Sequence, residues 1–190
     1  MIMLIGITGL IASGKSTVSA YLRERGYRVI DADAMVREEL EDETVIAALV
    51  ERFGAGILAG KSINRKKLGQ YIFENKEDRL FLNALIHPRV IAKIKQYAGI
   101  DDIIFIEVPL LYETGIEALF DKIIVVYADY QTVKERLMKR DNITEEYAIK
   151  KINAQMDIEE KKKRADFVID NRKGLDRTFR QLDTVLRRLI

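Results

Sequence analysis

The sequence predicts an α/β fold in which a five-stranded parallel sheet lies between two layers of helices, a three-layer α/β/α arrangement. Two observations carry this prediction. Short apolar runs recur along the chain and alternate with helical patterns, which is typical of a parallel sheet. A glycine-rich loop joins the first apolar run to a helical pattern. The carboxyl ends of such strands share one edge of the sheet, where ligands bind.

The first apolar run, Ile2–Thr8, has no polar face and is expected to be a buried strand. The next segment, Gly9–Ser16 (GLIASGKS), fits the pattern G-x-x-x-x-G-K-[ST]. Val18, Tyr21 and Leu22 then follow at the spacing of one helix face. This order of strand, loop and helix predicts a phosphate-binding P-loop.

A P-loop binds phosphates because its backbone N–H groups and the positive end of the helix dipole point at the anion. Lys15 is then expected to reach the β and γ phosphates, and the Ser16 hydroxyl to face Mg²⁺. The alternative, a glycine turn followed by a surface lysine, is disfavoured because the motif is complete and both flanks fit.

Four further strands are expected at Tyr27–Ile30, Ile103–Val108, Ile123–Tyr127 and Phe167–Ile169. The stretch Ala34–Gly99 contains no convincing strand and is far longer than one crossover helix needs. We expect a helical insertion beside the strand ends, where a phosphoryl acceptor would bind.

The stretch Thr132–Arg164 is helical in pattern and densely charged, as expected for a solvated pair of helices that moves over the site. Within it, Arg136 and Arg140 are four residues apart and share one helix face. Arginines there can offset phosphate charge, although a solvated basic face is the alternative. Lys161–Arg164 follow two glutamates without interleaved aromatic residues, which favours a solvated helix end.

The composition excludes several classes of site and partner. Cys is absent and His occurs once, which excludes thiolate and multi-histidine metal sites. Lys and Arg number 32 against 30 Asp and Glu, a net charge of +2 that gives no electrostatic case for nucleic-acid binding. No apolar run reaches the length of a membrane span, and no basic leader precedes the first run, so a cytoplasmic protein is expected.

Several carboxylates follow the expected strands. Asp31 and Asp33 close the second strand, next to the loop if the sheet is built as proposed, and Asp33 is the stronger candidate to orient or deprotonate an attacking hydroxyl. Asp33 could also cap a helix that begins near Ala34. The acidic partner of Mg²⁺ stays open among Asp33, Glu107 and Glu113. His87 precedes a proline, a pair that often just starts a helix.

Taken together, these pieces resemble the dephospho-coenzyme A kinase family over nearly the whole chain. The matching residues are Ile7–Thr17, Asp31-Ala32-Asp33 with Arg37, Asn64-Arg65 with Leu68, His87-Pro88, Val108–Leu111 with Glu113, Gln131, Arg136, Arg140, Ala165-Asp166 and Val168–Asn171. The P-loop alone occurs in many nucleotide-binding proteins, whereas this ordered set is much more specific. The family loop often has glycine where this chain has Ala12, a change that adds only a methyl group.

The resemblance implies ATP-dependent phosphorylation of the ribose 3′-hydroxyl of dephospho-CoA, with Mg²⁺, to give CoA and ADP. It implies one domain over 1–190, with a core (1–33, 101–131 and 165–190), a CoA-binding insertion (34–100) and a lid (132–164). A monomer or weak homo-oligomer is expected.

The resemblance also assigns roles to single residues. Asp33, Lys15 and Arg140 would be catalytic. ATP and Mg²⁺ would contact Gly9, Ala12, Ser13, Gly14, Lys15, Ser16, Thr17, Arg136, Arg140 and Asn171, with the metal at Ser16. Dephospho-CoA would contact Thr8, Asp33, Arg37, Arg65, His87, Arg89 and Leu110.

Two other functions remain open. Another P-loop small-molecule or nucleoside monophosphate kinase would share the loop and the lid without requiring the rest of the ordered set. A nucleotide-dependent switch or regulatory ATPase would share the loop but has no use for a long acceptor-binding region.

Overall fold

The computed structural model describes residues 3–100 and 102–189, and these fall into two compact units, 3–31 with 97–189, and 32–96. The first unit contains β1 (Met3–Thr8), α1 (Lys15–Glu24), β2 (Arg28–Asp31), β5 (Ile103–Glu107), β6 (Lys122–Tyr127), α6 (Tyr130–Asp141), α7 (Glu145–Asn153), α8 (Ile158–Arg164), β7 (Phe167–Asp170) and α9 (Leu175–Leu189). Ile2, where the first strand was expected to begin, lies outside the described residues.

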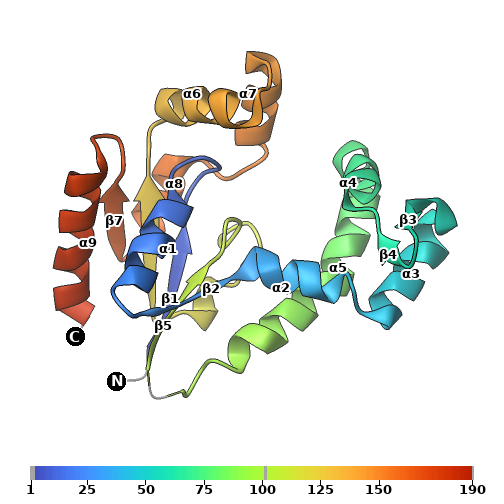
Figure 1. Cartoon of the computed structure of the whole chain (residues 1–190), viewed down its shortest axis with the longest axis horizontal. Helices are drawn as coiled ribbons and strands as arrows, with labels where there is room; N and C mark the ends of the chain where they lie inside the picture. The colour runs from blue at the N-terminus through green and yellow to red at the C-terminus, as the bar shows by residue number, and fades with distance from the viewer. Residues whose placement is uncertain (1–2, 101, 190) are drawn as a thin grey trace. The chain divides into compact units, whose positions relative to one another are not determined.

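The five strands of the first unit form one parallel sheet in the order β2-β5-β1-β6-β7 (Figure 1). Every predicted strand is present with bounds within one residue, and the predicted fold class is confirmed. The central strand β1 is apolar on both sides because both faces of the sheet are covered.

One face of the sheet is covered by α1 and α9. Ile5, Ile7 and Phe105 of the strands pack there against Val18 of α1 and Leu182 of α9, all fully buried. The opposite face is covered partly by the chain between β5 and β6. A Cβ at Gly6 would lie 2.6 Å from the Leu111 side chain, so only glycine fits this crossing without displacing a neighbour.

The connection from β5 to β6 corrects one expectation. A helical pattern was expected between these strands, but the chain forms turns and a short 3-10 helix at Glu117–Leu119. One turn is closed where the N–H and the hydroxyl of Thr114 both donate hydrogen bonds to the carbonyl of Leu110. The left-handed backbone of Gly115 (φ 66°) stops any helix from continuing.

The second unit is mainly helical. It contains α2 (Ala32–Glu39), α3 (Glu43–Phe53), β3 (Leu58–Ala59), β4 (Ser62–Ile63), α4 (Arg65–Glu74) and α5 (Lys76–Lys95). The long helix α5 packs against α2 and α4. The expectation of no strand is wrong here, because Leu58–Ala59 and Ser62–Ile63 pair as a small antiparallel hairpin. No helix among the described residues is long and apolar enough to cross a bilayer.

Candidate active site

The loop between β1 and α1 folds back on itself. The N–H of Ser13 donates to the carbonyl of Leu10 at 3.1 Å, and Gly14 enters α1 with φ 98°, in the left-handed region. A Cβ at Gly9 would lie 2.4 Å from the carbonyl oxygen of Val126, so glycine is required there. Ala12 also has a positive φ of 58°, which costs an alanine about 1–2 kcal/mol and favours glycine at this position.

The loop has the features of an anion cradle. The Lys15 ammonium donates to the carbonyls of Gly9 (3.2 Å) and Leu10 (3.0 Å), which holds its charge beside the loop. No described side chain caps α1, whereas α3 to α8 each begin with an Asp, Asn or Thr cap. The first N–H groups of α1 therefore suit a phosphate, and the exposed Ser16 at the same end suits a cation bound to that phosphate.

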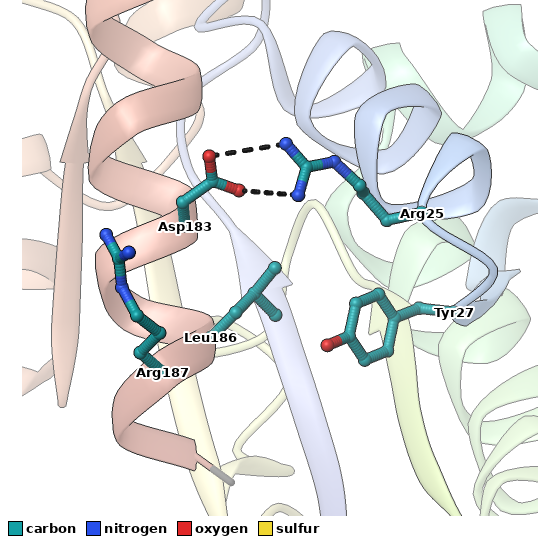
Figure 2. Close-up of a pocket in the computed structure, with 5 residues that line it drawn as sticks. All are labelled: Arg25, Tyr27, Asp183, Leu186 and Arg187. Carbon is teal, nitrogen blue, oxygen red and sulfur yellow. Dashed lines mark hydrogen bonds and ion pairs between the residues drawn. The ribbon is translucent and has the colours of Figure 1, made fainter.

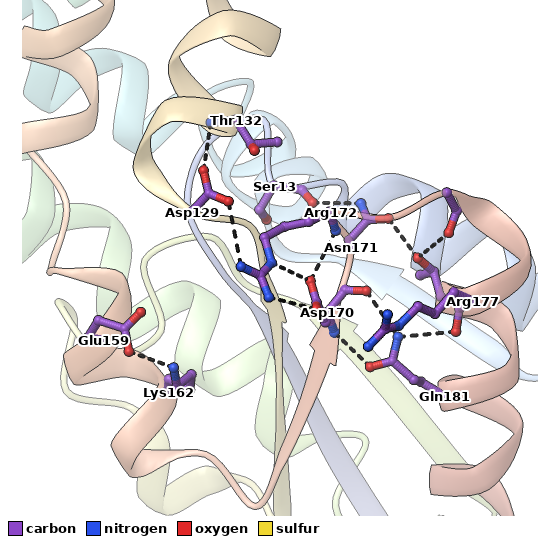
Figure 3. A network of polar contacts seen from close by, with 12 residues as sticks. Ser13, Asp129, Thr132, Glu159, Lys162, Asp170, Asn171, Arg172, Arg177 and Gln181 are labelled. Carbon is purple, nitrogen blue, oxygen red and sulfur yellow. Dashed lines mark hydrogen bonds and ion pairs between the residues drawn. The ribbon is translucent and has the colours of Figure 1, made fainter.

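Asn171, directly after β7, connects the loop to three other elements (Figure 3). Its side-chain amide donates to the carbonyl of Ser13 at 2.8 Å, and its side-chain oxygen accepts from the Thr178 hydroxyl of α9 at 2.9 Å. Its backbone N–H donates to Tyr127, and its carbonyl accepts from Arg136 at 2.8 Å. Asn171 is 5% exposed, so it acts as a strut behind the loop.

The two arginines of α6 have different partners. Arg136 reaches Asn171, whereas Arg140 lies at the exposed end of α6 and bonds to its neighbour Asp141 at 2.8 and 3.3 Å. Lys151 of α7 also donates to Asp141 at 3.0 Å. The hydrogen bond from Arg140, followed by that from Lys151, lowers the pKa of Asp141 to about 2. Although the two arginines share one helix face, Arg136 therefore lies beside Asn171, which supports the loop, whereas Arg140 is exposed.

Of the acidic candidates in the first unit, Glu107 lies beside the end of β1, the strand that leads into the loop. It pairs in register with Ile7 of β1, and its carboxylate accepts a 2.7 Å hydrogen bond from the buried Ser19 of α1. Asp31 was predicted to lie next to the loop, but its strand β2 does not neighbour β1. The strand β5 lies between them, and its Glu107 is in register with both Asp31 and Ile7. No group of three or more acidic or histidine side chains within 3–100 and 102–189 could hold a metal alone.

Glu113 is engaged elsewhere. Its carboxylate accepts from the Met156 N–H at 2.8 Å and pairs with the Lys161 ammonium at 2.8 Å. Lys161 also donates to the carbonyl of Pro109 at 3.1 Å. Glu113 is therefore the weaker candidate for a Mg²⁺ ligand, because a buried cation already neutralises it.

The burial of Lys161 corrects the sequence interpretation of Lys161–Arg164 as a solvated helix end. Lys162 is half-buried and Lys163 is exposed, and both pair with glutamates of their own helix, but the Lys161 side chain is 0% exposed. Burial lowers the pKa of Lys161, and the ion pair with Glu113 opposes that shift. The available signal was its position three residues after Ile158, which places it on the buried face of α8.

Two expected acceptor contacts of the first unit differ in exposure. Thr8 is fully buried, and its hydroxyl donates to the carbonyl of Pro109 at 3.3 Å. In this structure the hydroxyl therefore bonds to the protein and is not exposed to a substrate. Leu110 is 42% exposed in the turn after β5 and is open to a ligand.

In the second unit, Asp33 and Arg37 are exposed and lie four residues apart, on one face of α2. The alternative in which Asp33 caps the helix is wrong, because α2 begins at Ala32 and Asp33 lies inside its first turn. Both side chains are thus presented by a regular helix that starts directly after β2.

The other acceptor candidates are spread over α4 and α5. Arg65 is exposed at the first position of α4. His87 lies in the middle of α5, so the interpretation of His87-Pro88 as a helix start is wrong, and burial lowers the pKa of its imidazole. Arg89 pairs with Glu39 at 3.2 Å and with Asp42 at 3.5 Å, which gives it a structural role in joining α5 to the end of α2.

A cavity of about 310 Å³ lies elsewhere in the first unit (Figure 2). Its lining is Arg25, Tyr27, Asp183, Leu186 and Arg187, with Arg25 bound to Asp183 at 3.2 Å. These residues come from the end of α1, the start of β2 and the end of α9. The cavity is therefore at the amino ends of the strands, at the opposite edge of the sheet from the P-loop.

Comparisons with known proteins agree on one family. The family model described as dephospho-CoA kinase matches residues 3–177. A dephospho-CoA kinase of Fusobacterium nucleatum is 44% identical over 185 residues, covering 96% of both chains. One of Listeria monocytogenes is 42% identical, covering 98% of this chain and 96% of that protein. The solved dephospho-CoA kinase from Campylobacter jejuni has a TM-score of 0.76 at 31% identity and covers 98% of this chain and 96% of its own.

Proposed function

This chain belongs to the dephospho-CoA kinase family, and we propose that it transfers the γ-phosphoryl group of ATP to the ribose 3′-hydroxyl of dephospho-CoA. The products are CoA and ADP, and the reaction completes CoA synthesis. The observation that carries the proposal is the uncapped start of α1 beside the Lys15 ammonium, which is built for a polyphosphate, in a chain that matches this family almost end to end.

The loop and its support would bind the nucleotide. The α1 N–H groups and Lys15 hold the β and γ phosphates, for which Lys15 must exchange its bonds to Gly9 and Leu10 for phosphate oxygens. The backbone around Asn171, with Arg136 beside it, would form part of the adenine pocket. The exposed Ser16 hydroxyl would help to hold Mg²⁺, which would supply positive charge against the charge that develops on the phosphates.

The second unit (32–96) would hold the acceptor, and α6, α7 and α8, named here the lid helices, would carry arginines to the phosphates. In the reaction, the 3′-oxygen forms a bond to the γ phosphorus while the bond to the bridging oxygen of ADP breaks. The proton of the hydroxyl passes to Asp33, whose exposed carboxylate lies in the first turn of α2. Arg140 offsets charge on the transferring group.

One assay tests the proposal. Purified protein with ATP and Mg²⁺ should release ADP when dephospho-CoA is present, with little release when it is omitted. Lys15→Ala is the matched background control and should abolish the dependent signal. ADP release that ignores dephospho-CoA but rises with another small alcohol or a nucleoside monophosphate would instead favour a different P-loop kinase. Slow release that no acceptor stimulates would favour a nucleotide-dependent switch.

Cellular location and assembly are further parts of the proposal. We place the enzyme in the cytoplasm as a monomer or weak homo-oligomer without nucleic-acid partners, which its net charge of +2 supports. Light scattering across a concentration series, with and without ATP, tests the assembly state.

A further inference from the structure

The segment that joins α7 to α8 contacts the tip of the P-loop. The N–H of Ile11 donates to the side-chain oxygen of Gln155 at 2.7 Å. Gln155 lies just beyond the end of α7 (Glu145–Asn153), so a residue of the lid region holds a backbone group of the phosphate loop. Because the acceptor is a neutral amide, the contact adds no negative charge where phosphates must bind.

A second set of contacts fixes the same segment from behind. The Met156 N–H donates to Glu113, and the Lys161 ammonium bonds to Glu113 and to the carbonyl of Pro109. The carbonyl of Pro109 also accepts from Thr8, the last residue of β1 before the loop. The segment is therefore bonded to the tip of the loop at Ile11 and to the turn after β5, which in turn bonds to Thr8 just before the loop.

Lys161 is costly to bury and does no evident chemistry. An ammonium group with no exposed surface is retained only when its hydrogen bonds are satisfied by partners that the fold holds in place. Here the partners come from the turn after β5, while the lysine comes from α8. The bonds of Lys161 therefore fix the position of α8 relative to the turn after β5.

We propose that Lys161 and Gln155 are positioning residues that anchor the lid helices to the P-loop. The anchor places the arginines of the lid helices where they can contact the phosphates. The proposal deepens the function argued above and rests on it. Neither residue touches a reacting atom. Lys161 acts through Glu113 and Pro109, and Gln155 acts through the N–H of Ile11.

The experiment compares Lys161→Met with Lys163→Met, an exposed lysine of the same helix that pairs with Glu160. Assays are run well below the melting temperature of each variant, so that loss of stability does not enter the rate. We expect Lys161→Met to lower kcat at least tenfold while the KM for dephospho-CoA stays within twofold, and Lys163→Met to match wild type. A purely structural role would lower the melting temperature without this separation of kcat from KM.

A fluorescence measurement reports on the lid itself. The chain has no tryptophan, so Tyr147→Trp places a single tryptophan, which can be excited selectively over the tyrosines, on α7. An ATP analogue with a nitrogen bridge between its β and γ phosphates should change the emission of the otherwise wild-type protein. We expect that change to be reduced by at least half in the Lys161→Met background at saturating analogue.

Gln155→Ala carries the test if Lys161→Met does not fold, because it removes one hydrogen bond and no buried charge. A kcat within threefold of wild type in either folded variant would overturn the proposal, as would an unaltered emission change in Lys161→Met. Failure of the proposed function is separate, because the wild-type protein would then release no ADP in response to dephospho-CoA.

Discussion

The side-chain amide of Asn171 donates a 2.8 Å hydrogen bond to the carbonyl of Ser13, so the residue after the last strand supports the loop after the first. Asn171→Ala should raise the KM for ATP and lower stability by about 1–3 kcal/mol, because the Ser13 carbonyl and the Thr178 hydroxyl both lose a buried partner. Thermal melting and nucleotide titration measure the two effects. The exposed Thr184→Ala, near the end of α9, is the control, and equal behaviour of both variants would contradict the strut role.

Gly14 tests the same contact from the loop side. A Cβ at Gly14 would lie 2.0 Å from the Asn171 amide nitrogen, in addition to the strain of φ 98°. Gly14→Ala should therefore destabilise the protein more than Gly26→Ala, where φ is also positive but nothing lies within 4 Å of the new methyl and only about 1–2 kcal/mol of backbone strain applies. Adding Asn171→Ala to Gly14→Ala should recover part of the melting temperature, and the absence of recovery would place the clash elsewhere.

Asp33→Asn should lower kcat by about 10²–10⁴, the usual contribution of a general base, with an unchanged melting temperature because Asp33 is exposed. Steady-state ADP release measures it. Asp31→Asn is the matched change two residues earlier, at the end of β2, and should retain most of the activity. Near-normal turnover in Asp33→Asn would remove this carboxylate as the base.

Arg140→Ala should lower kcat by about 10³ or more, as for arginines that stabilise phosphoryl transfer elsewhere. Arg140→Lys should recover little, because an ammonium cannot make the bidentate contact of a guanidinium. Lys139→Ala, on an exposed neighbour in the same helix, is the control and should leave kcat unchanged. An active Arg140→Ala variant would assign Arg140 to the solvated face of α6.

His87 predicts a pH dependence of stability. Burial lowers its pKa below the ordinary value of 6.5, so the unfolded chain binds the proton more readily than the folded one. Stability from this group is therefore present above pH 6.5 and is lost as the pH falls through its lowered folded pKa. The melting temperature of wild type relative to His87→Gln should fall between pH 7.5 and 5.5. A constant difference would show that the imidazole titrates as if exposed.

The strands of the sheet were predictable because buried parallel strands are apolar on both faces and end at a change of composition. The hairpin of Leu58–Ala59 and Ser62–Ile63 was not, since two-residue strands are too short for any periodicity to appear. The β5–β6 connection was misjudged because the left-handed backbone of Gly115 ends the single helical turn that Thr114 closes onto Leu110.

The loop, its lysine and Asn171 were found from a contiguous motif or from the family resemblance. The Glu113–Lys161 pair was missed because its partners are 48 residues apart and each has the composition of a solvated segment. A buried charge is visible in a sequence only through helical phase, and Lys161 shares the buried face of α8 with Ile158.

The strand order has a consequence for synthesis of the chain. The strand β1 is made first and becomes the central strand, yet its register partner for Met3 is Ile103, 100 residues later. At roughly 5–20 residues per second, translation needs about 5–20 s to deliver that partner. During this interval both edges of an apolar strand are unpaired, so β1 is the strand of this sheet that a chaperone should bind first.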